Sequence, residues 1–489
     1  MNHSQKRLAI KELMDASGIR FGTSGVRGPV GEMSRTLCFA YTSAFLNAVS
    51  ATSGAVALAI DLRPSSPEIA AACAAAIAHA GLEVDYCGAI PTPALALYAQ
   101  SKGVPGIMVT GSHIPFDRNG IKFYSPTGEI TKADENCICQ AVVDVPEGGL
   151  TSRLPPVNRS ASQDYIDRYL RFFPPDCLSG MKLGFYEHSS VARDLLQELL
   201  EMLGATVIPL GRVDEFVPID TEAVSDDDVQ LARRWADQHG FDAILSTDGD
   251  ADRPLIGDER GHWLRGDITG ILCAQYLGAL AVATTISCNT AVELCGSFLK
   301  VLRTRIGSPY VIEGIDQLVE SGARNVVGFE PNGGFLVGSR LEKNGRTLAP
   351  LLTRDAVLPI LCLLSMAREK GCKVSELARE LPARFTASDR LQSFPTETSQ
   401  AMLRELAASP EALAELLAGL CGEPRSLDQT EGLRIYLAND EIVFFRPSGN
   451  APELRCYAES TTQERAGLLV QECLQRMNAR LASQRPVHI

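Results

Sequence analysis

The sequence predicts an α/β protein in which three similar domains precede a smaller α+β domain. Three stretches, at residues 56–88, 181–211 and 284–314, share one order of elements: an apolar strand, a polar turn, an amphipathic helix that ends at a glycine, and a second strand. This order is typical of a βαβ unit, and the copies begin roughly one small domain apart. A chain of 489 residues has room for about three or four such domains.

The three units can be compared directly in the sequence. The first reads VALAIDLRPSSPEIAAACAAAIAHAGLEVDYCG, the second MKLGFYEHSSVARDLLQELLEMLGATVIPLG and the third TTISCNTAVELCGSFLKVLRTRIGSPYVIEG. Each opens with a short apolar run, and apolar residues at helical spacing follow the polar turn. Because βαβ units are common, the likeness favours a threefold repeat but also fits three unrelated α/β domains.

The C-terminal part has a different pattern. SELARELPARF and SPEALAELLAGL have helical periodicity, IYLANDEIVFFRP alternates like strands around a turn, and QERAGLLVQECLQRMNARLAS predicts a closing helix. Linkers are expected at 145–160, near residue 260 and after Gly371, where turn-forming residues gather. These boundaries predict four domains, over residues 1–157, 158–260, 261–375 and 376–489.

The composition is that of a globular protein with an acidic charge balance. Lys and Arg total 46 against 59 Asp and Glu, which gives a net charge of −13, while 45% of the residues are apolar. These values exclude disordered and collagen-like chains. They also argue against non-specific nucleic-acid binding, which needs a basic surface. Any phosphate site is therefore expected to be local.

The cysteines and the apolar runs indicate the compartment. The 14 cysteines lack the paired Cys-x-x-Cys elements of a zinc site, and they fit a reducing environment better than a disulfide framework. Charged residues interrupt the N-terminal segment where a secretory signal would be apolar, and no apolar run is long enough to span a membrane. We expect a cytoplasmic protein without nucleic-acid or membrane partners, and the sequence leaves the oligomeric state open.

The segment IMVTGSHIPFDRNGIKFY, at 107–124, places a serine in a turn between two strands. Gly111 is expected to let the backbone bend sharply and approach a ligand, which would expose the hydroxyl of Ser112 beside His113, while Lys122 lies on the second strand. A nucleophilic serine is one interpretation, and a hairpin with a serine in its turn is the other. A hydrolase elbow would need G-x-S-x-G, which this segment lacks.

The segment ILSTDGDADRPLIGDE, at 244–259, places Asp248, Asp250 and Asp252 at alternate positions after a strand. Three crowded carboxylates repel one another unless a hard cation such as Mg²⁺ or Ca²⁺ lies among them. An EF-hand would need glycine where Arg253 stands. A haloacid-dehalogenase nucleophile, which also places aspartates after a strand, and a solvated acidic loop remain as alternatives.

Three more glycine loops carry polar side chains. GFEPNGGFLVGS, at 328–339, offers Glu330 and Asn332, which suit sugar hydroxyls, although glycine turns without a ligand are at least as frequent. FGTSGVRG, at 21–28, ends beside Arg27. In VFFRPSGNAPELRCYAE, at 443–459, guanidinium groups, a hydroxyl and the N–H groups of a glycine turn suit phosphate, with an ordinary hairpin as the alternative. Its candidate ligands are Arg446, Ser448, Gly449, Asn450 and Arg455.

Together, these loops resemble the signatures of the α-D-phosphohexomutase superfamily, the phosphomannomutases and phosphoglucomutases. FGTSGVRG, TGSHIPFDRNGIK, DGDADR and RPSGNAPELR stand in the family order at family-like spacing across nearly the whole chain. The resemblance implies three topologically related mixed-sheet α/β domains and a C-terminal domain around a central cleft. It also implies an enzyme that interconverts hexose 1- and 6-phosphates of mannose, glucose or both, through a phosphoserine and a hexose 1,6-bisphosphate that also serves as activator.

The resemblance also implies residue roles. Ser112 matches the phosphorylated serine and, with Asp248, Asp250 and Asp252, would hold Mg²⁺. The remaining matches assign proton transfer to His113 and Lys122, phosphate binding or catalysis to Arg27 and Arg253, sugar hydroxyls to Glu330 and Asn332, and the distal phosphate to Arg446, Ser448, Gly449 and Asn450.

Departures from the family pattern concern the sugar. Ile114 stands where the family has asparagine, the loop at 330–334 lacks the family's Glu-x-Ser-Gly-His, and Ser308 replaces a histidine of some bifunctional members. Ser24, in place of the aspartate of phosphoglucosamine mutases, favours the hexose enzymes. A phosphoglucosamine or N-acetylglucosamine phosphate mutase remains an alternative. A catalytically silent sugar-phosphate binding protein, which predicts neither phosphoserine nor metal dependence, is another.

Overall fold

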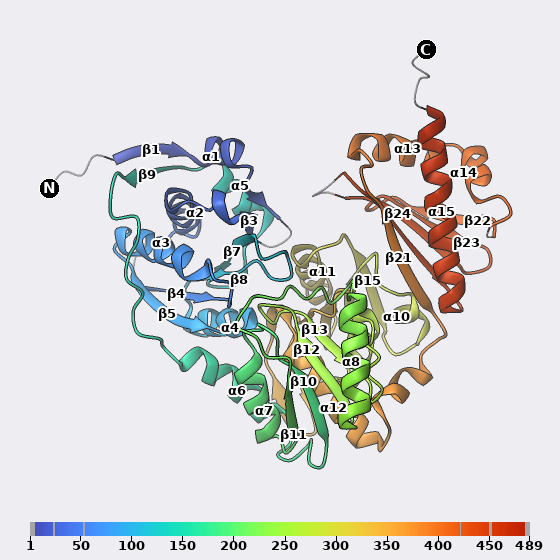
Figure 1. Ribbon diagram of the computed structural model, residues 1–489, viewed down its shortest axis with the longest axis horizontal. Coiled ribbons are helices and arrows are strands. Elements are labelled where there is room, and N and C mark those ends of the chain that lie inside the picture. Colours follow the sequence, from blue (N-terminus) through green and yellow to red (C-terminus); the bar gives the residue numbers. More distant parts are fainter. Residues whose placement is uncertain (1–4, 23–24, 52–53, 421, 449–451, 485–489) are drawn as a thin grey trace. The chain divides into compact units, whose positions relative to one another are not determined.

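The computed structural model describes residues 5–22, 25–51, 54–420, 422–448 and 452–484. The chain forms two compact units (Figure 1). Unit 1 comprises Met1–Ala283 and Gly307–Ala378, and unit 2 comprises Thr284–Ile306 and Arg379–Ile489. Within the described ranges, no helix combines the length and the apolar character needed to cross a membrane.

The first sheet of unit 1 has the strand order β2-β3-β7-β6-β4-β5. Strand β4 pairs in parallel with β5 and β6, whereas β7 runs antiparallel to β6. Nearly all of β4 is buried, because helices cover the sheet as in other parallel α/β folds. The elements are β2 (Arg20–Phe21), β3 (Val26–Pro29), β4 (Ala55–Ile60), β5 (Glu83–Ala89), β6 (Gly106–Val109), β7 (Arg118–Ser125), α2 (Arg35–Ala48), α3 (Ser66–His79) and α4 (Thr92–Lys102).

The second sheet has the strand order β11-β10-β12-β13. Strand β10 lies in parallel between β11 and β12, and β13 is antiparallel to β12. Its elements are β10 (Lys182–Tyr186), β11 (Thr206–Leu210), β12 (Ala243–Thr247), β13 (Pro254–Gly257), α6 (Ser160–Phe172), α7 (Arg193–Met202) and α8 (Asp226–His239).

The third sheet contributes β14-β16-β17-β20 in this order, with β17 antiparallel to both neighbours. Strand β14 continues into unit 2, where the N–H of Ile286 donates to the carbonyl of Thr304 in β15. The elements are β14 (Ala281–Thr285), β15 (Lys300–Thr304), β16 (Val326–Phe329), β17 (Phe335–Val337), β20 (Leu351–Asp355), α9 (Gly266–Tyr276), α10 (Ala291–Leu294), α11 (Ser308–Glu320) and α12 (Val357–Lys370).

The threefold repeat predicted from the sequence is confirmed. In each sheet, the first strand of the repeat lies between the second and the third, and a fourth strand returns antiparallel. The helix of the third copy is much shorter than those of the other two. Helix α10 has only four residues, because Gly296 adopts a left-handed φ of 65° directly after its C-cap.

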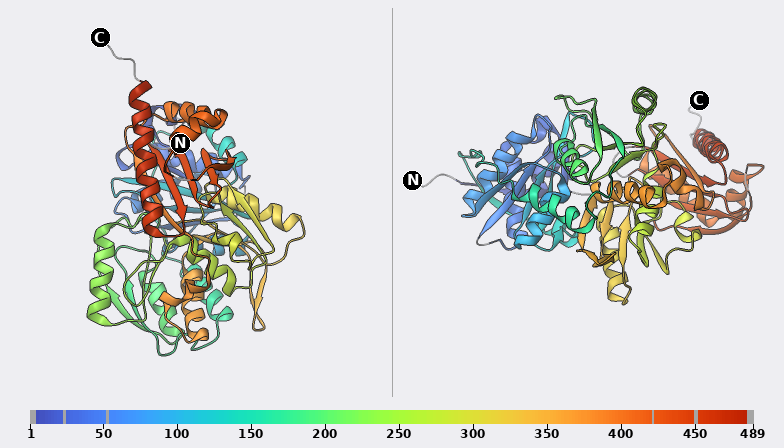
Figure 2. Two further views of the ribbon diagram at one scale, coloured as in Figure 1. Left: turned by 90° about the vertical axis from the view of Figure 1, so that its right-hand side faces the viewer. Right: turned by 90° about the horizontal axis from the view of Figure 1, so that it is seen from below.

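The predicted α+β domain forms most of unit 2. Its antiparallel sheet has the order β21-β25-β24-β23-β22, and α15 packs along β21 and β25 (Figure 2). Leucine, isoleucine and phenylalanine side chains of the sheet and helices form its core. The elements are β21 (Phe385–Leu391), β22 (Pro424–Asp428), β23 (Leu433–Leu437), β24 (Ile442–Pro447), β25 (Leu454–Ser460), α13 (Thr396–Ala408), α14 (Pro410–Leu417) and α15 (Gln463–Gln484).

Short elements complete unit 1. Strands β1 and β9 pair antiparallel, β8 pairs with β7, and β18 pairs with β19. Their bounds, with those of the remaining helices, are β1 (Gln5–Ala9), α1 (Ile10–Ser17), η1 (Val30–Glu32), β8 (Gly128–Glu129), α5 (Lys132–Gln140), β9 (Val142–Pro146), β18 (Leu341–Lys343) and β19 (Arg346–Leu348). The last of the short helices, η2 (Val374–Glu380), begins in unit 1 and ends in unit 2.

Candidate active site

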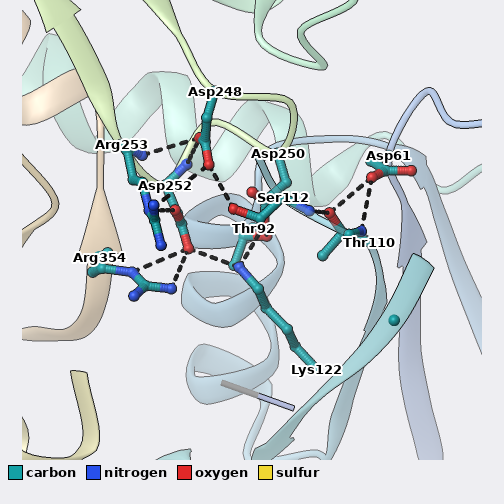
Figure 3. Close-up of polar contacts among 12 residues, drawn as sticks. Asp61, Thr92, Thr110, Ser112, Lys122, Asp248, Asp250, Asp252, Arg253 and Arg354 are labelled. Carbon is teal, nitrogen blue, oxygen red and sulfur yellow. Dashed lines mark hydrogen bonds and ion pairs between the residues drawn. The ribbon is translucent and has the colours of Figure 1, made fainter. Parts of the chain in front are cut away.

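Ser112 lies in the turn after β6 and is completely buried. Its backbone is left-handed, with φ at 53°, a conformation that costs a non-glycine residue about 1–3 kcal/mol. The Oγ donates a hydrogen bond to Asp248 Oδ2 at 2.6 Å (Figure 3). It also lies 3.3 Å from His113 Nδ1. The strained turn therefore directs the serine hydroxyl toward the aspartate loop, which is 136 positions away in the sequence.

Two expectations for this turn are wrong: the hydroxyl of Ser112 is buried and not exposed, and Gly111 has a different role. Ser112, and not Gly111, has the left-handed backbone that bends the turn. Gly111 is needed for a different close approach, because a Cβ there would lie only 2.6 Å from Cζ and Nε of Arg63. The glycine therefore lets the turn pack directly on a buried guanidinium.

Asp61 and Arg63, which the sequence analysis did not single out, lie beneath this turn. Both are 1% exposed, and Arg63 Nε lies 3.2 Å from Asp61 Oδ2. The Arg63 guanidinium donates to backbone carbonyls of the serine turn, and Asp61 accepts from Thr110 Oγ1 at 2.8 Å. The signal in the sequence was a pair of charged residues directly after the apolar strand VALAI.

Asp248, Asp250 and Asp252 follow β12 and are at most 1% exposed. One carboxylate oxygen from each lies within 4.8 Å of the others. Asp250 Oδ1 and Asp252 Oδ1 are buried and have no hydrogen-bond partner among the described residues. The burial excludes a solvated acidic loop, and oxygen atoms without donors are what an oxygen-ligated divalent cation would use.

The second oxygens of two of these carboxylates are held by cations (Figure 3). Lys122 Nζ lies 2.6 Å from Asp250 Oδ2 and 2.7 Å from Asp252 Oδ2, and Arg354 Nη2 lies 2.7 Å from the same Asp252 oxygen. Thr92 Oγ1 also donates to Asp250 Oδ2. Lys122 and Arg354 hold the pKa of Asp252 well below its ordinary value although burial raises it, and burial and the neighbouring carboxylates raise the pKa of Asp248.

Positive charge is also concentrated beside the serine. Burial, and then repulsion from Arg253 and Arg354, lowers the pKa of Arg27 to about 10. Its Nε is buried and has no hydrogen-bond partner within the described ranges. The charge on Arg253, then burial, then Arg27 hold the pKa of His113 far below its ordinary value, so its imidazole is neutral. An anion bound here would relieve this repulsion.

The glycine loop after β16 joins the cluster through Glu330. The carboxylate of Glu330 accepts from Arg354 Nη1 at 3.1 Å, so Arg354 bridges Glu330 and Asp252. The side chain of Asn332 stabilises the turn in which it lies, because its Oδ1 accepts a hydrogen bond from the N–H of Gly334 at 2.9 Å. The structure thus places Glu330 with the metal-binding candidates, and Asn332 in a local structural contact.

Arg446 and Arg455, both in unit 2, lie opposite each other on β24 and β25. Arg446 Nη2 donates to Glu431 Oε1 at 3.1 Å. Arg446 and Glu431 line a cavity of about 450 Å³, and Arg305 and Arg404 line it as well. The N–H of Ser448 donates to the carbonyl of Glu453. Gly449 and Asn450 lie outside the described residues.

Sequence reasoning missed Thr92 and Arg354 for a common reason. Arg354 is the penultimate residue of strand β20, LLTRD, and Thr92 begins helix α4, so neither lies in a glycine loop. Each reaches an aspartate more than 100 positions away in the sequence. Only the fold brings them to the site.

The chain is similar to known proteins over nearly its whole length. Models of the phosphoglucomutase/phosphomannomutase alpha/beta/alpha domains I, II and III match residues 18–147, 163–261 and 265–385, and the C-terminal domain model matches 372–475. The phosphomannomutase of Salmonella muenchen is 48% identical over 96% of this chain and 98% of its own length. That of Sinorhizobium fredii is 42% identical over 94% and 99%. The solved structure of pp63/parafusin, a phosphoglucomutase from Paramecium, has a TM-score of 0.73 at 18% identity and covers 95% of each chain.

Proposed function

The chain belongs to the phosphoglucomutase/phosphomannomutase family, and on that premise we propose that Ser112 carries the phosphoryl group that the enzyme transfers. The protein is a phosphohexomutase, an intramolecular phosphotransferase that interconverts hexose 1- and 6-phosphates. The observation that carries the proposal for Ser112 is its buried hydroxyl, which lies 2.6 Å from Asp248 in a site rich in arginine. Mannose phosphates are the proposed preferred substrates, since two relatives that are 48% and 42% identical to this chain are phosphomannomutases.

Mg²⁺ fits the three aspartates. Asp248, Asp250 and Asp252 would hold it, together with the phosphate on Ser112, because their carboxylates converge and the buried Oδ1 atoms of Asp250 and Asp252, which have no hydrogen-bond partner among the described residues, suit a hard cation. When bound, Mg²⁺ would supply positive charge to the phosphoryl oxygens. Lys122 keeps the second oxygens of Asp250 and Asp252 in place, and so orients the pair without competing for the first.

The transfer step exchanges one phosphorus–oxygen bond for another. A sugar hydroxyl oxygen forms a bond to phosphorus while the bond from phosphorus to Ser112 Oγ breaks, in line with the attack. Once the phosphoryl group offsets the charges of Arg253 and Arg27, the pKa of His113 can rise, and its imidazole takes the hydroxyl proton and then passes it to the freed Oγ, which is 3.3 Å from Nδ1. Arg27 and Arg253 bind the equatorial phosphoryl oxygens, where charge is concentrated.

The product of this step is a hexose 1,6-bisphosphate. If the bisphosphate turns around and returns its other phosphate to Ser112, the net reaction moves the phosphate between the two ends of the sugar. We assign Arg446, Ser448, Gly449, Asn450 and Arg455 to the phosphate that is not being transferred, and Glu330 with Asn332 to the sugar hydroxyls. Free hexose 1,6-bisphosphate would also phosphorylate Ser112 directly and thus act as activator.

A coupled mutase assay tests the proposal, with the 1-phosphates of mannose, glucose, glucosamine and N-acetylglucosamine compared side by side. Peptide mapping by mass spectrometry should locate one phosphate on Ser112. Ser112→Ala should lose at least about a thousandfold in kcat, because the covalent route is then closed. Full activity in Ser112→Ala would show that Ser112 does not carry the phosphoryl group. A clear preference for the amino sugars would contradict the proposed hexose substrates.

A cytoplasmic location is part of the proposal. The described cysteines are all free thiols, and several of them are buried in the core. Free thiols persist in reducing compartments, whereas proteins of oxidising compartments tend to be disulfide-bonded.

A further inference from the structure

The guanidinium of Arg63 is hydrogen-bonded along the whole serine turn. Its Nη2 donates to the carbonyls of Ser112 at 2.9 Å and Ile114 at 2.5 Å. Its Nη1 donates to the carbonyls of Pro115 and Arg118, both at 2.8 Å. One planar group thus fixes four carbonyls within seven residues: three lie in the turn that carries the serine, and the fourth belongs to Arg118, the first residue of β7.

Asp61 fixes the other side of the same turn. Its Oδ2 accepts from Thr110 Oγ1 at 2.8 Å and from the N–H of Gly111 at 3.3 Å. Thr110 Oγ1 in turn accepts from the N–H of Ser112 at 2.8 Å (Figure 3). The backbone of Ser112 is therefore held at its carbonyl through Arg63 and at its N–H through Thr110 and Asp61.

The serine turn and the aspartate loop also pack around this pair. The ring of Phe216 lies 3.9 Å from Arg63 Cζ, stacked on the guanidinium. A Cβ on Gly249 would come within 2.9 Å of the same ring and 3.0 Å of the Ser112 carbonyl. A shift of the guanidinium would therefore disturb the serine turn and its contact with the aspartate loop together.

We propose that Arg63 and Asp61 are positioning residues that hold Ser112 in its left-handed conformation, with the hydroxyl directed at Asp248. The inference rests on the proposed function of Ser112. Four carbonyls satisfied by one planar group leave the turn no freedom to relax into an ordinary conformation. The planar shape of the guanidinium matters here as much as its charge, since an ammonium has three donors around one nitrogen and cannot reach four carbonyls.

The decisive variant is Arg63→Lys in the full chain, which keeps the charge and removes the planar fork. We expect kcat to fall about 100-fold, because a misplacement of about 1 Å in a reacting group has this effect. The KM for the hexose 1-phosphate should stay within about twofold, since the proposed sugar and phosphate ligands are other residues. Amides at 111–118 should exchange with deuterium faster than in the wild type, and less phosphate should reach Ser112 from added hexose 1,6-bisphosphate.

Arg346→Lys is the matched control. Arg346 also donates to two backbone carbonyls in unit 1, those of Arg171 and Phe173, which lie outside the serine turn. This variant should keep the wild-type kcat. Wild-type kcat in Arg63→Lys, or an equal loss in both variants, would overturn the inference.

Asp61→Asn keeps the proposal testable if Arg63→Lys does not fold. The amide is nearly the same size as the carboxylate but removes the charge that faces Arg63 Nε. We expect kcat to fall about tenfold at unchanged KM, and an unchanged kcat would overturn the inference. Failure of the proposed function gives a different result, because the wild type itself would then lack turnover and phosphoserine.

Discussion

Arg446→Ala removes the guanidinium group that we propose binds the phosphate that is not being transferred. In the structure it is paired with Glu431 at 3.1 Å, and the two side chains are 20% and 16% exposed. A phosphate must displace this partner before it gains a charge-assisted hydrogen bond of about 1.5–3 kcal/mol, and loss of the partly exposed pair costs about 0.5 kcal/mol. The net effect of about 1–2.5 kcal/mol predicts a fall in kcat/KM of about 5- to 60-fold.

Steady-state kinetics with and without added hexose 1,6-bisphosphate measure this effect. A weakened phosphate site lets the intermediate escape, which leaves Ser112 unphosphorylated, so the variant should need more added bisphosphate than the wild type. Arg425→Ala is the control, because Arg425 is an exposed arginine of the same unit that pairs with Asp440 at 3.0 Å. Near-normal KM and no added need for bisphosphate in Arg446→Ala would refute the reasoning.

The reciprocal change tests the competition itself. Glu431→Gln removes the charge that competes for Arg446, while its amide oxygen can still accept from the N–H of Ile306, now at 2.6 Å from the carboxylate. The KM for the hexose phosphate should fall about two- to fivefold, because this factor corresponds to the free energy that a partly exposed ion pair contributes. A rise in KM would mean that Glu431 orients Arg446 for the substrate, contrary to the competition.

Three other results are expected. Asp250→Asn should fold normally but bind Mg²⁺ at least about tenfold more weakly in calorimetry, because hard-cation affinity follows ligand charge; unchanged affinity would argue against the site. Glu330→Gln should lower kcat/KM for mannose and glucose 1-phosphates by at least about tenfold while N-acetylglucosamine 1-phosphate stays poor, and an unaltered ranking would remove Glu330 from sugar recognition. His188 is fully buried two residues after the end of β10, and this burial lowers its pKa to about 4. The unfolded chain, at a pKa near 6.5, therefore binds more protons below pH 6.5, and stability falls as the pH drops toward 4, by about 2 kcal/mol between pH 7 and 5. In His188→Gln, the thermal unfolding midpoint should depend less on pH between pH 7 and 5. If the variant showed the same pH dependence as the wild type, His188 would not be the source of this loss of stability.

The polar loops could be found from the sequence because each joins glycine and charged residues to the end of an apolar strand. Ser112 and the three aspartates follow β6 and β12, so local pattern alone marked them as candidates. The βαβ units were predictable for a similar reason, since strand and helix periodicity are local properties. The short helix α10 was not, because its end depends on the left-handed backbone of Gly296.

The supporting residues needed the fold. Arg354 and Asp252 are 102 positions apart, and no local pattern pairs them. Asp61 and Arg63 follow an apolar strand in DLRPSSPE, but the serines and the proline there match an ordinary helix start, so this local signal did not connect the two charged residues with the serine turn. The left-handed backbone of Ser112 was equally hidden, since serine has no special preference for that region.

The division of the chain into units has a consequence for its biosynthesis. Unit 2 combines residues 284–306 with residues 379–489. Within it, Asn289 Nδ2 donates to the carbonyl of Arg384, and the N–H of Thr290 donates to Glu459. At about 5–20 residues per second, the ribosome needs roughly 4–14 s to make the intervening segment 307–378. During that time the earlier segment has emerged without its partners, and a chain that stops before residue 379 leaves it exposed, so this segment is where we expect chaperones and proteases to act first.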